Sequence, residues 1–249
     1  MAITNRLGEE RYNNFGSKMI ICRYSKSKDI DIYFPNYNWV AKNRRYEDFV
    51  RGKVKCPYEP RIYGKGYIGE GEYKSYENGK LSRCYRTWEH MLQRCYDNKY
   101  KEKYPTYKEC ICDESWLNFQ NFAKWYSDNY YTVGDELMSL DKDILVKNNK
   151  IYGSDTCIFT PKSINSLFVK NDRNRSEHGI GAIYRKRDKK FESWCNDKCL
   201  GRYDTQQEAF QAYKKFKENY IKQVADEYKE YIPQKLYEAM YNYEVEIGD

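Results

Sequence analysis

The stretch that most constrains the fold lies between residues 179 and 220, where short apolar runs alternate with turn-forming residues. Three runs have the composition of strands, namely Gly181–Arg187, Lys190–Cys195 and Cys199–Tyr203. Asp188-Lys189 and Asn196-Asp197-Lys198 separate them, and Asn and Asp tolerate the left-handed backbone that turns need. This spacing predicts a three-stranded antiparallel sheet.

A helix is predicted directly after this sheet. Thr205 is followed three residues later by Glu208, which is the pattern of a capping box. The following apolar residues share one helical face: Ala209, Phe210, Ala212, Tyr213, Phe216 and Tyr220. We therefore expect the helix to cover one face of the sheet.

This segment resembles the AP2 DNA-binding domain. The matching residues are Lys190-Phe191, Leu200-Gly201-Arg202-Tyr203-Asp204-Thr205 and Glu208-Ala209-Phe210-Gln211-Ala212-Tyr213. AP2 domains lay such a sheet in the DNA major groove, and exposed Arg and Trp side chains contact bases and phosphates. The resemblance implies a set of DNA-binding residues: Arg173, Arg175, Arg185, Lys186, Arg187, Lys190, Trp194 and Arg202. Trp194 would contact DNA only if it lies on the exposed face, and would otherwise belong to the core.

The charge distribution agrees with a double-stranded DNA partner. The chain carries 44 Lys and Arg against 37 Asp and Glu, a net charge of +7. Basic residues crowd the predicted sheet and the segment before it, whereas the chain beyond Asp204, which includes the helix, is acidic on balance. Such a one-sided footprint is typical of nucleic-acid binding. An ordinary solvated sheet face is the alternative interpretation.

Residues Ser139–Phe168 predict a strand, a loop, a second strand and a helix. Leu140, Ile144 and Val146 partly alternate with polar residues, which is typical of a half-buried strand. Cys157-Ile158-Phe159 forms a second apolar run. Thr160-Pro161 then suits the start of a helix, with Thr as cap and Pro at the first helical position.

This order resembles the ββα-metal core of HNH nucleases. The resemblance implies Asp141 and Asn165 as ligands for Mg²⁺ or Mn²⁺, and Lys142 and Asp143 as the catalytic positions. Lys142 occupies the place of the family's general-base histidine, and lysine is protonated near neutral pH. Whether this core cleaves DNA therefore stays open. In the alternative, Asp141 and Asp143 form ion pairs with neighbouring lysines.

The combination of these units with an N-terminal β module resembles phage-encoded HNH/AP2 proteins, many of which are regarded as homing endonucleases, and the resemblance covers most of residues 64–230. We expect an α+β fold with a small N-terminal β module (residues 1–62), an HNH-like ββα domain with helical additions that cover it (63–172), and an AP2-like domain with a C-terminal helical tail (173–249). Three functions remain: a DNA-binding protein with a degenerate HNH core, an active Mg-dependent endonuclease, or a non-enzymatic antagonist of a host defence protein. The resemblance places the protein in the cytoplasm of an infected bacterial host.

Other segments give local expectations. Lys18–Tyr24 and Asp29–Phe34 predict a hairpin, in a module that serves either for docking or folding or as an auxiliary DNA contact. Apolar stripes predict helices over residues 85–97 and 116–126, and a further one in the tail beyond Pro233. The glycine-rich stretch Gly64–Gly71 is expected to be a flexible connector.

The cysteine pattern and the hydropathy limit the cellular compartments in which the protein is expected. The nine cysteines include no CxxC pair, so reduced thiols are expected and a zinc site is only weakly indicated. No apolar run of about eighteen residues occurs, so we expect no membrane partner.

Overall fold

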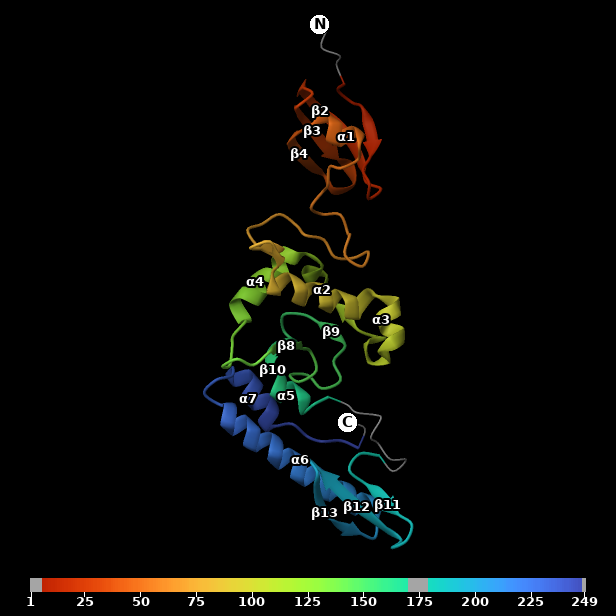
Figure 1. Cartoon of the computed structure of the whole chain (residues 1–249), viewed down its shortest axis with the longest axis vertical. Helices are drawn as coiled ribbons and strands as arrows, with labels where there is room; N and C mark the ends of the chain where they lie inside the picture. The colour runs from red at the N-terminus through yellow and green to blue at the C-terminus, as the bar shows by residue number, and fades with distance from the viewer. Residues whose placement is uncertain (1–5, 170–178, 248–249) are drawn as a thin grey trace. The chain divides into compact units, whose positions relative to one another are not determined.

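The computed structural model describes residues 6–169 and 179–247 and shows a mixed α+β chain with several small sheets (Figure 1). The predicted α+β class is confirmed. The chain forms two compact units, one of residues 1–128 with 150–153 and one of residues 129–149 with 154–249. The three-domain division stays a prediction.

The N-terminal part of the first unit is a four-stranded antiparallel sheet in sequential order. Its strands are β1 (Glu10–Tyr12), β2 (Lys18–Lys26), β3 (Asp29–Phe34) and β4 (Trp39–Arg44), followed by α1 (Tyr46–Val50). The predicted hairpin is confirmed as β2 and β3. The side chains that alternate inward form a core of their own: Met19, Ile21, Ile30, Ile32, Phe34, Ala41, Phe49, Val54 and Cys56.

The predicted helix over residues 85–97 is confirmed as α2 (Arg83–Tyr96), and its apolar stripe is buried. The Ser82 side chain caps α2 by accepting a hydrogen bond from the Tyr85 backbone nitrogen at 3.1 Å. The short α3 (Asn98–Lys103) follows. The remaining strands of this unit are short: β5 (Tyr76–Glu77), β6 (Lys80–Leu81), β7 (Ile111–Cys112) and β9 (Ile151–Tyr152), of which β7 and β9 pair in parallel.

Two expectations for the first unit are wrong. The helix predicted over residues 116–126 is divided into a 3-10 turn (Glu114–Leu117) and α4 (Phe119–Asn129). Asn118 between them is extended, and its side chain accepts from the Gln120 nitrogen at 3.0 Å. The glycine-rich connector is packed, since a Cβ on Gly66 would lie 2.3 Å from a Leu92 methyl carbon.

In the second unit, β8 (Met138–Asp141) and β10 (Ile158–Pro161) pair antiparallel and α5 (Lys162–Ser166) follows. The predicted order of strand, loop, strand and helix is confirmed, but two details are wrong. The first strand ends at Asp141 rather than near Val146. Thr160 does not cap α5, because it lies within β10 and its hydroxyl donates to the Ser139 carbonyl at 3.4 Å. Pro161 is the N-cap instead.

The predicted three-stranded sheet is confirmed. It consists of β11 (Ile183–Arg185), β12 (Lys190–Cys195) and β13 (Lys198–Tyr203), in sequential antiparallel order. The long α6 (Gln206–Tyr228) begins with the expected capping box. Figure 1 shows the sheet at one end of α6 and α7 (Gln234–Tyr241) beside the other, which confirms the predicted tail helix.

One core joins α6 to the ββα segment. Ile221 and Val224 of α6 pack in a single cluster with Ile158 of β10, Ile164 of α5 and Leu236 of α7. The two halves of α6 thus have different partners: the first covers the sheet, and the second completes the core of the ββα segment.

Within the described residues, no helix is long and apolar enough to cross a membrane. All nine cysteines lie in the described ranges, and each is a free thiol.

Replacement of Thr205 by Ala should lower the free energy of unfolding of the second unit by about 1 kcal/mol, because it removes the acceptor for the Glu208 nitrogen at 3.2 Å. Urea unfolding followed by circular dichroism measures the change. Gln207→Ala, at an exposed position in the same turn, is the matched control. An equal loss in both variants would show that the capping box does not stabilise α6.

Candidate nucleic-acid interface

The sheet formed by β11, β12 and β13 has one face against α6 and one face outward. Along β12, Ser193 and Cys195 are buried, whereas the side chain between them, Trp194, is 38% exposed. The cross-strand register pairs Glu192 with Ile183 of β11 and with Arg202 of β13. Trp194 therefore belongs to the outer face, which resolves the alternative left open by the sequence.

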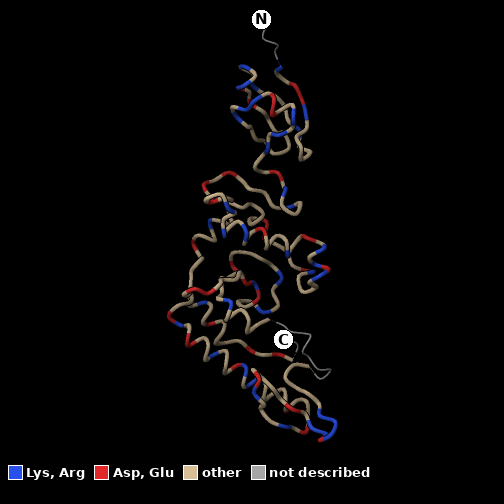
Figure 2. Tube along the Cα trace, viewed as in Figure 1, with Lys and Arg blue, Asp and Glu red and all other residues tan. Residues whose placement is uncertain are grey.

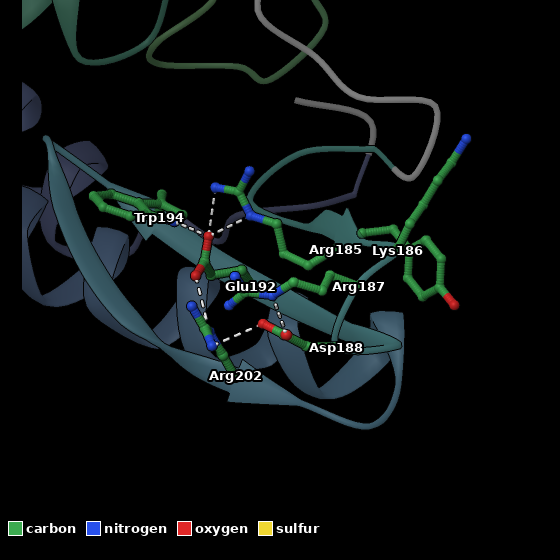
Figure 3. A pocket seen from close by; sticks show the side chains of 8 residues that line it. Arg185, Lys186, Arg187, Asp188, Glu192, Trp194 and Arg202 are labelled. Atoms are coloured by element: carbon green, nitrogen blue, oxygen red, sulfur yellow. Dashed lines mark hydrogen bonds and ion pairs between the residues drawn. The ribbon is translucent and has the colours of Figure 1, made fainter.

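The outer face is organised around the carboxylate of Glu192 (Figure 3). It accepts hydrogen bonds from Trp194 Nε1 at 2.9 Å, from Arg185 Nε at 2.7 Å and from Arg202 Nε at 3.0 Å. These partners come from all three strands. The hydrogen bond from Trp194 and the Arg185 guanidinium lower the pKa of Glu192 to about 2. Glu192 is thus charged and only 4% exposed, and it holds two guanidinium groups in fixed orientations.

A second carboxylate, Asp188 in the β11–β12 turn, extends this network. It accepts from Arg187 Nε and from Arg202 Nη1, both at 2.9 Å. The hydrogen bond with Arg187 lowers the pKa of Asp188. Lys186 extends away from Glu192 in Figure 3. Lys190 donates to Asp204 at 2.5 Å.

An open hollow of about 510 Å³ lies on this face, and its lining consists of Tyr184, Arg185, Lys186, Arg187, Asp188, Glu192, Trp194 and Arg202. Figure 2 shows Lys and Arg gathered at the β11–β12 end of the sheet. Four cationic side chains line the hollow against the two carboxylates. The guanidinium of Arg has five N–H donors, so the ones that do not bind Glu192 or Asp188 can point toward a ligand. The hollow therefore suits an anionic, hydrogen-bond-accepting ligand.

Six of the eight predicted DNA-binding residues lie in or beside this sheet, and Arg173 and Arg175 lie outside the described residues. The sequence reasoning missed Glu192 and Asp188 as site residues. A signal for Glu192 was present, because it stands two residues before Trp194 in a strand and therefore shares its face.

The residues predicted for the nuclease site bond mainly to one another and to the backbone of their own loop. Asp141 Oδ1 accepts from the backbone nitrogens of Asp143 and Ile144, both at 2.8 Å, and so turns the chain out of β8. Lys142 is only 5% exposed. Its ammonium donates to the Asn149 carbonyl at 2.9 Å and forms an ion pair with Asp143. Asn149 Nδ2 donates back to the Lys142 carbonyl at 2.8 Å, so the two residues close the loop.

These residues fit a divalent metal poorly. Burial raises the pKa of Asp141, which disfavours the charged form that Mg²⁺ binds. Asp143 is paired with Lys142, and Asn165 contributes only a neutral amide from α5. No group of three His, Cys, Asp or Glu residues suited to a metal occurs in the described part of the chain. The Mg²⁺ or Mn²⁺ ion expected from the sequence stays a prediction.

Comparison with known proteins adds no family assignment. The chain matches no protein-family model, no curated protein and no solved structure. The functional argument therefore depends on the site itself.

Glu192→Gln should lower the free energy of unfolding at pH 7 by roughly 2 kcal/mol, because it removes the charge from hydrogen bonds to two guanidinium groups. The folded pKa of about 2 is below the unfolded value of 4.5. The contribution of Glu192 is therefore complete above pH 4.5 and disappears as the pH falls toward 2. Urea titrations of both proteins between pH 7 and pH 2.5 measure the difference. A difference that does not change with pH would contradict this assignment.

Proposed function

We propose that this protein binds double-stranded DNA with the outer face of the sheet formed by β11, β12 and β13. The observation that carries the proposal is the set of three side chains, Arg185, Trp194 and Arg202, held around buried Glu192. A charged side chain that is ordered before binding loses less conformational entropy when its ligand arrives.

The dimensions and chemistry of the face support a duplex ligand. The major groove is about 12 Å wide and admits β-strands, whose outward side chains then reach base edges. Arg185 and Arg202 are of the residue type that binds guanine or phosphate through paired N–H donors. Lys186 and Arg187, at the β11–β12 turn, are placed to reach the phosphates that flank the groove.

We propose further that the ββα segment does not cleave this DNA. The position of the general base is held by Lys142, whose Nζ contacts the Asn149 carbonyl and the Asp143 carboxylate instead of facing an open site. The protein would then be a phage DNA-binding protein of the HNH/AP2 type with a degenerate nuclease core. An active endonuclease and an antagonist of a host defence protein are outcomes that the experiments below distinguish.

The double variant Lys186→Ala with Arg187→Ala should weaken duplex binding about tenfold and flatten its salt dependence, because each phosphate contact adds about 0.9 to the slope of log K against log salt. Fluorescence anisotropy with labelled random duplexes at several salt concentrations measures both effects. These two residues are chosen because neither of them binds Glu192, so the hydrogen bonds to Glu192 stay in place and only the bond from Arg187 to Asp188 is lost.

Lys215→Ala with Lys235→Ala is the matched control, since both side chains are exposed on helices and the charge change is the same. Equal losses of affinity in the two double variants would show that binding depends only on the net charge of the protein. That result would contradict the sheet as the interface. No duplex binding by the wild type would favour a protein antagonist instead.

Wild-type protein should leave supercoiled plasmid intact in Mg²⁺ or Mn²⁺. Gel electrophoresis after incubation tests this, with Asp141→Asn as the comparison. Asn keeps the oxygen that accepts from the Asp143 and Ile144 nitrogens but removes the charge. Metal-dependent nicking by the wild type that is lost in Asp141→Asn would establish the endonuclease and overturn the degenerate core.

A further inference from the structure

A second surface with the aromatic and basic residues typical of nucleic-acid binding lies in the N-terminal module, at the turn between β1 and β2. Phe15 is at this turn and is 49% exposed, and Tyr12 at the end of β1 is 67% exposed. Contact with water is unfavourable for aromatic rings of this size, and contact with a ligand would remove that apolar surface from water.

The turn is held in place by a buried polar network. Asn13 Oδ1 accepts from the backbone nitrogens of Phe15 and Ser17 at 3.0 and 2.8 Å. Its amide nitrogen donates to the Val54 carbonyl at 3.1 Å and to the buried carboxylate of Glu59. Every polar atom of the Asn13 amide thus has a partner. The exposure of Phe15 is therefore a property of an ordered turn.

Cations surround the exposed ring. Lys55 Nζ lies 5.6 Å and Arg61 Cζ lies 5.0 Å from the centroid of the Phe15 ring. Val54 and Cys56 are buried, so Lys53 and Lys55, which alternate with them, project outward. The Asn14 nitrogen donates to the Gly52 carbonyl at 2.9 Å and fixes this lysine segment beside the turn.

The net charge of the chain is concentrated in the same module. Residues 1–62 contain 13 Lys and Arg against 7 Asp and Glu, which gives +6 of the total +7. The two acidic residues nearest the turn in sequence are already paired, Glu9 with Arg11 at 3.1 Å and Glu10 with Lys18 at 2.8 Å. The surface therefore complements a polyanion.

We propose that this Phe15 patch, formed by Phe15, Lys53, Lys55 and Arg61, binds single-stranded nucleic acid. A base would stack on the exposed ring of Phe15 while the cations contact the phosphates beside it, which is how aromatic and basic side chains hold single strands. A duplex does not offer this contact, because its base faces are stacked inside the helix. The patch is separate from the sheet in the second unit, so the proposal does not depend on duplex binding there.

Phe15→Ala in the full chain should weaken binding of a fifteen-nucleotide oligo-dT about tenfold, since it removes the ring on which a base stacks. Anisotropy measures the affinity, with oligo-U as the RNA arm. An oligonucleotide that carries 2-aminopurine reports stacking directly, because its fluorescence is quenched on an aromatic ring. The quench should be present in the wild type and absent in Phe15→Ala.

Tyr231→Ala removes an aromatic side chain of the second unit that is 64% exposed, more than Phe15, and is the control. The variant with Lys186→Ala and Arg187→Ala should keep its affinity for oligo-dT, which separates this site from the duplex interface. Three results would overturn the proposal: unchanged affinity in Phe15→Ala, an equal loss in Tyr231→Ala, or equal competition by a duplex of the same length.

Discussion

The burial of α6 against two different partners is the interaction on which the second unit depends. A three-stranded sheet with one apolar face is too small to be stable alone, and the short pair β8–β10 has the same limitation. α6 removes both limitations, because Ala209 and Phe210 are buried where it covers the sheet and Ile221 and Ala225 are buried in the ββα core. The sheet and the ββα segment therefore share α6 as a common packing partner.

Charge is handled differently on the two surfaces of functional interest. On the sheet, carboxylates lie among the cations and orient them. The same carboxylates also lower the positive electrostatic potential of this face. On the Phe15 patch, buried Glu59 orders the backbone through Asn13 and lies 3.9 Å from the Arg61 guanidinium, while Lys53 and Lys55 project outward. The first arrangement favours directional hydrogen bonds to a ligand of fixed shape. The second favours a flexible polyanion.

The sequence predicted those parts of the fold that local patterns control. The β-turn residues and the pair Thr205 and Glu208 are such patterns, and they located the sheet and α6 correctly. The failures come from side chains that bond to the backbone. Asp141 and Asn118 each accept from nitrogens two or three residues ahead, which ends a strand in one case and divides a helix in the other. Apolar periodicity does not record such bonds, and for the same reason Glu192 was not recognised as the centre of its network.

The continuity of α6 has a geometric consequence. Fourteen residues separate Phe210, under the sheet, from Val224, in the ββα core, and an α-helix rises about 1.5 Å per residue, so the helix sets a spacing of about 21 Å. The sheet and the ββα core are therefore held at a fixed separation by one continuous helix. A substitution that kinks α6 between Phe210 and Val224, such as a proline, would move the sheet relative to the ββα segment while leaving each of the two packing contacts in place.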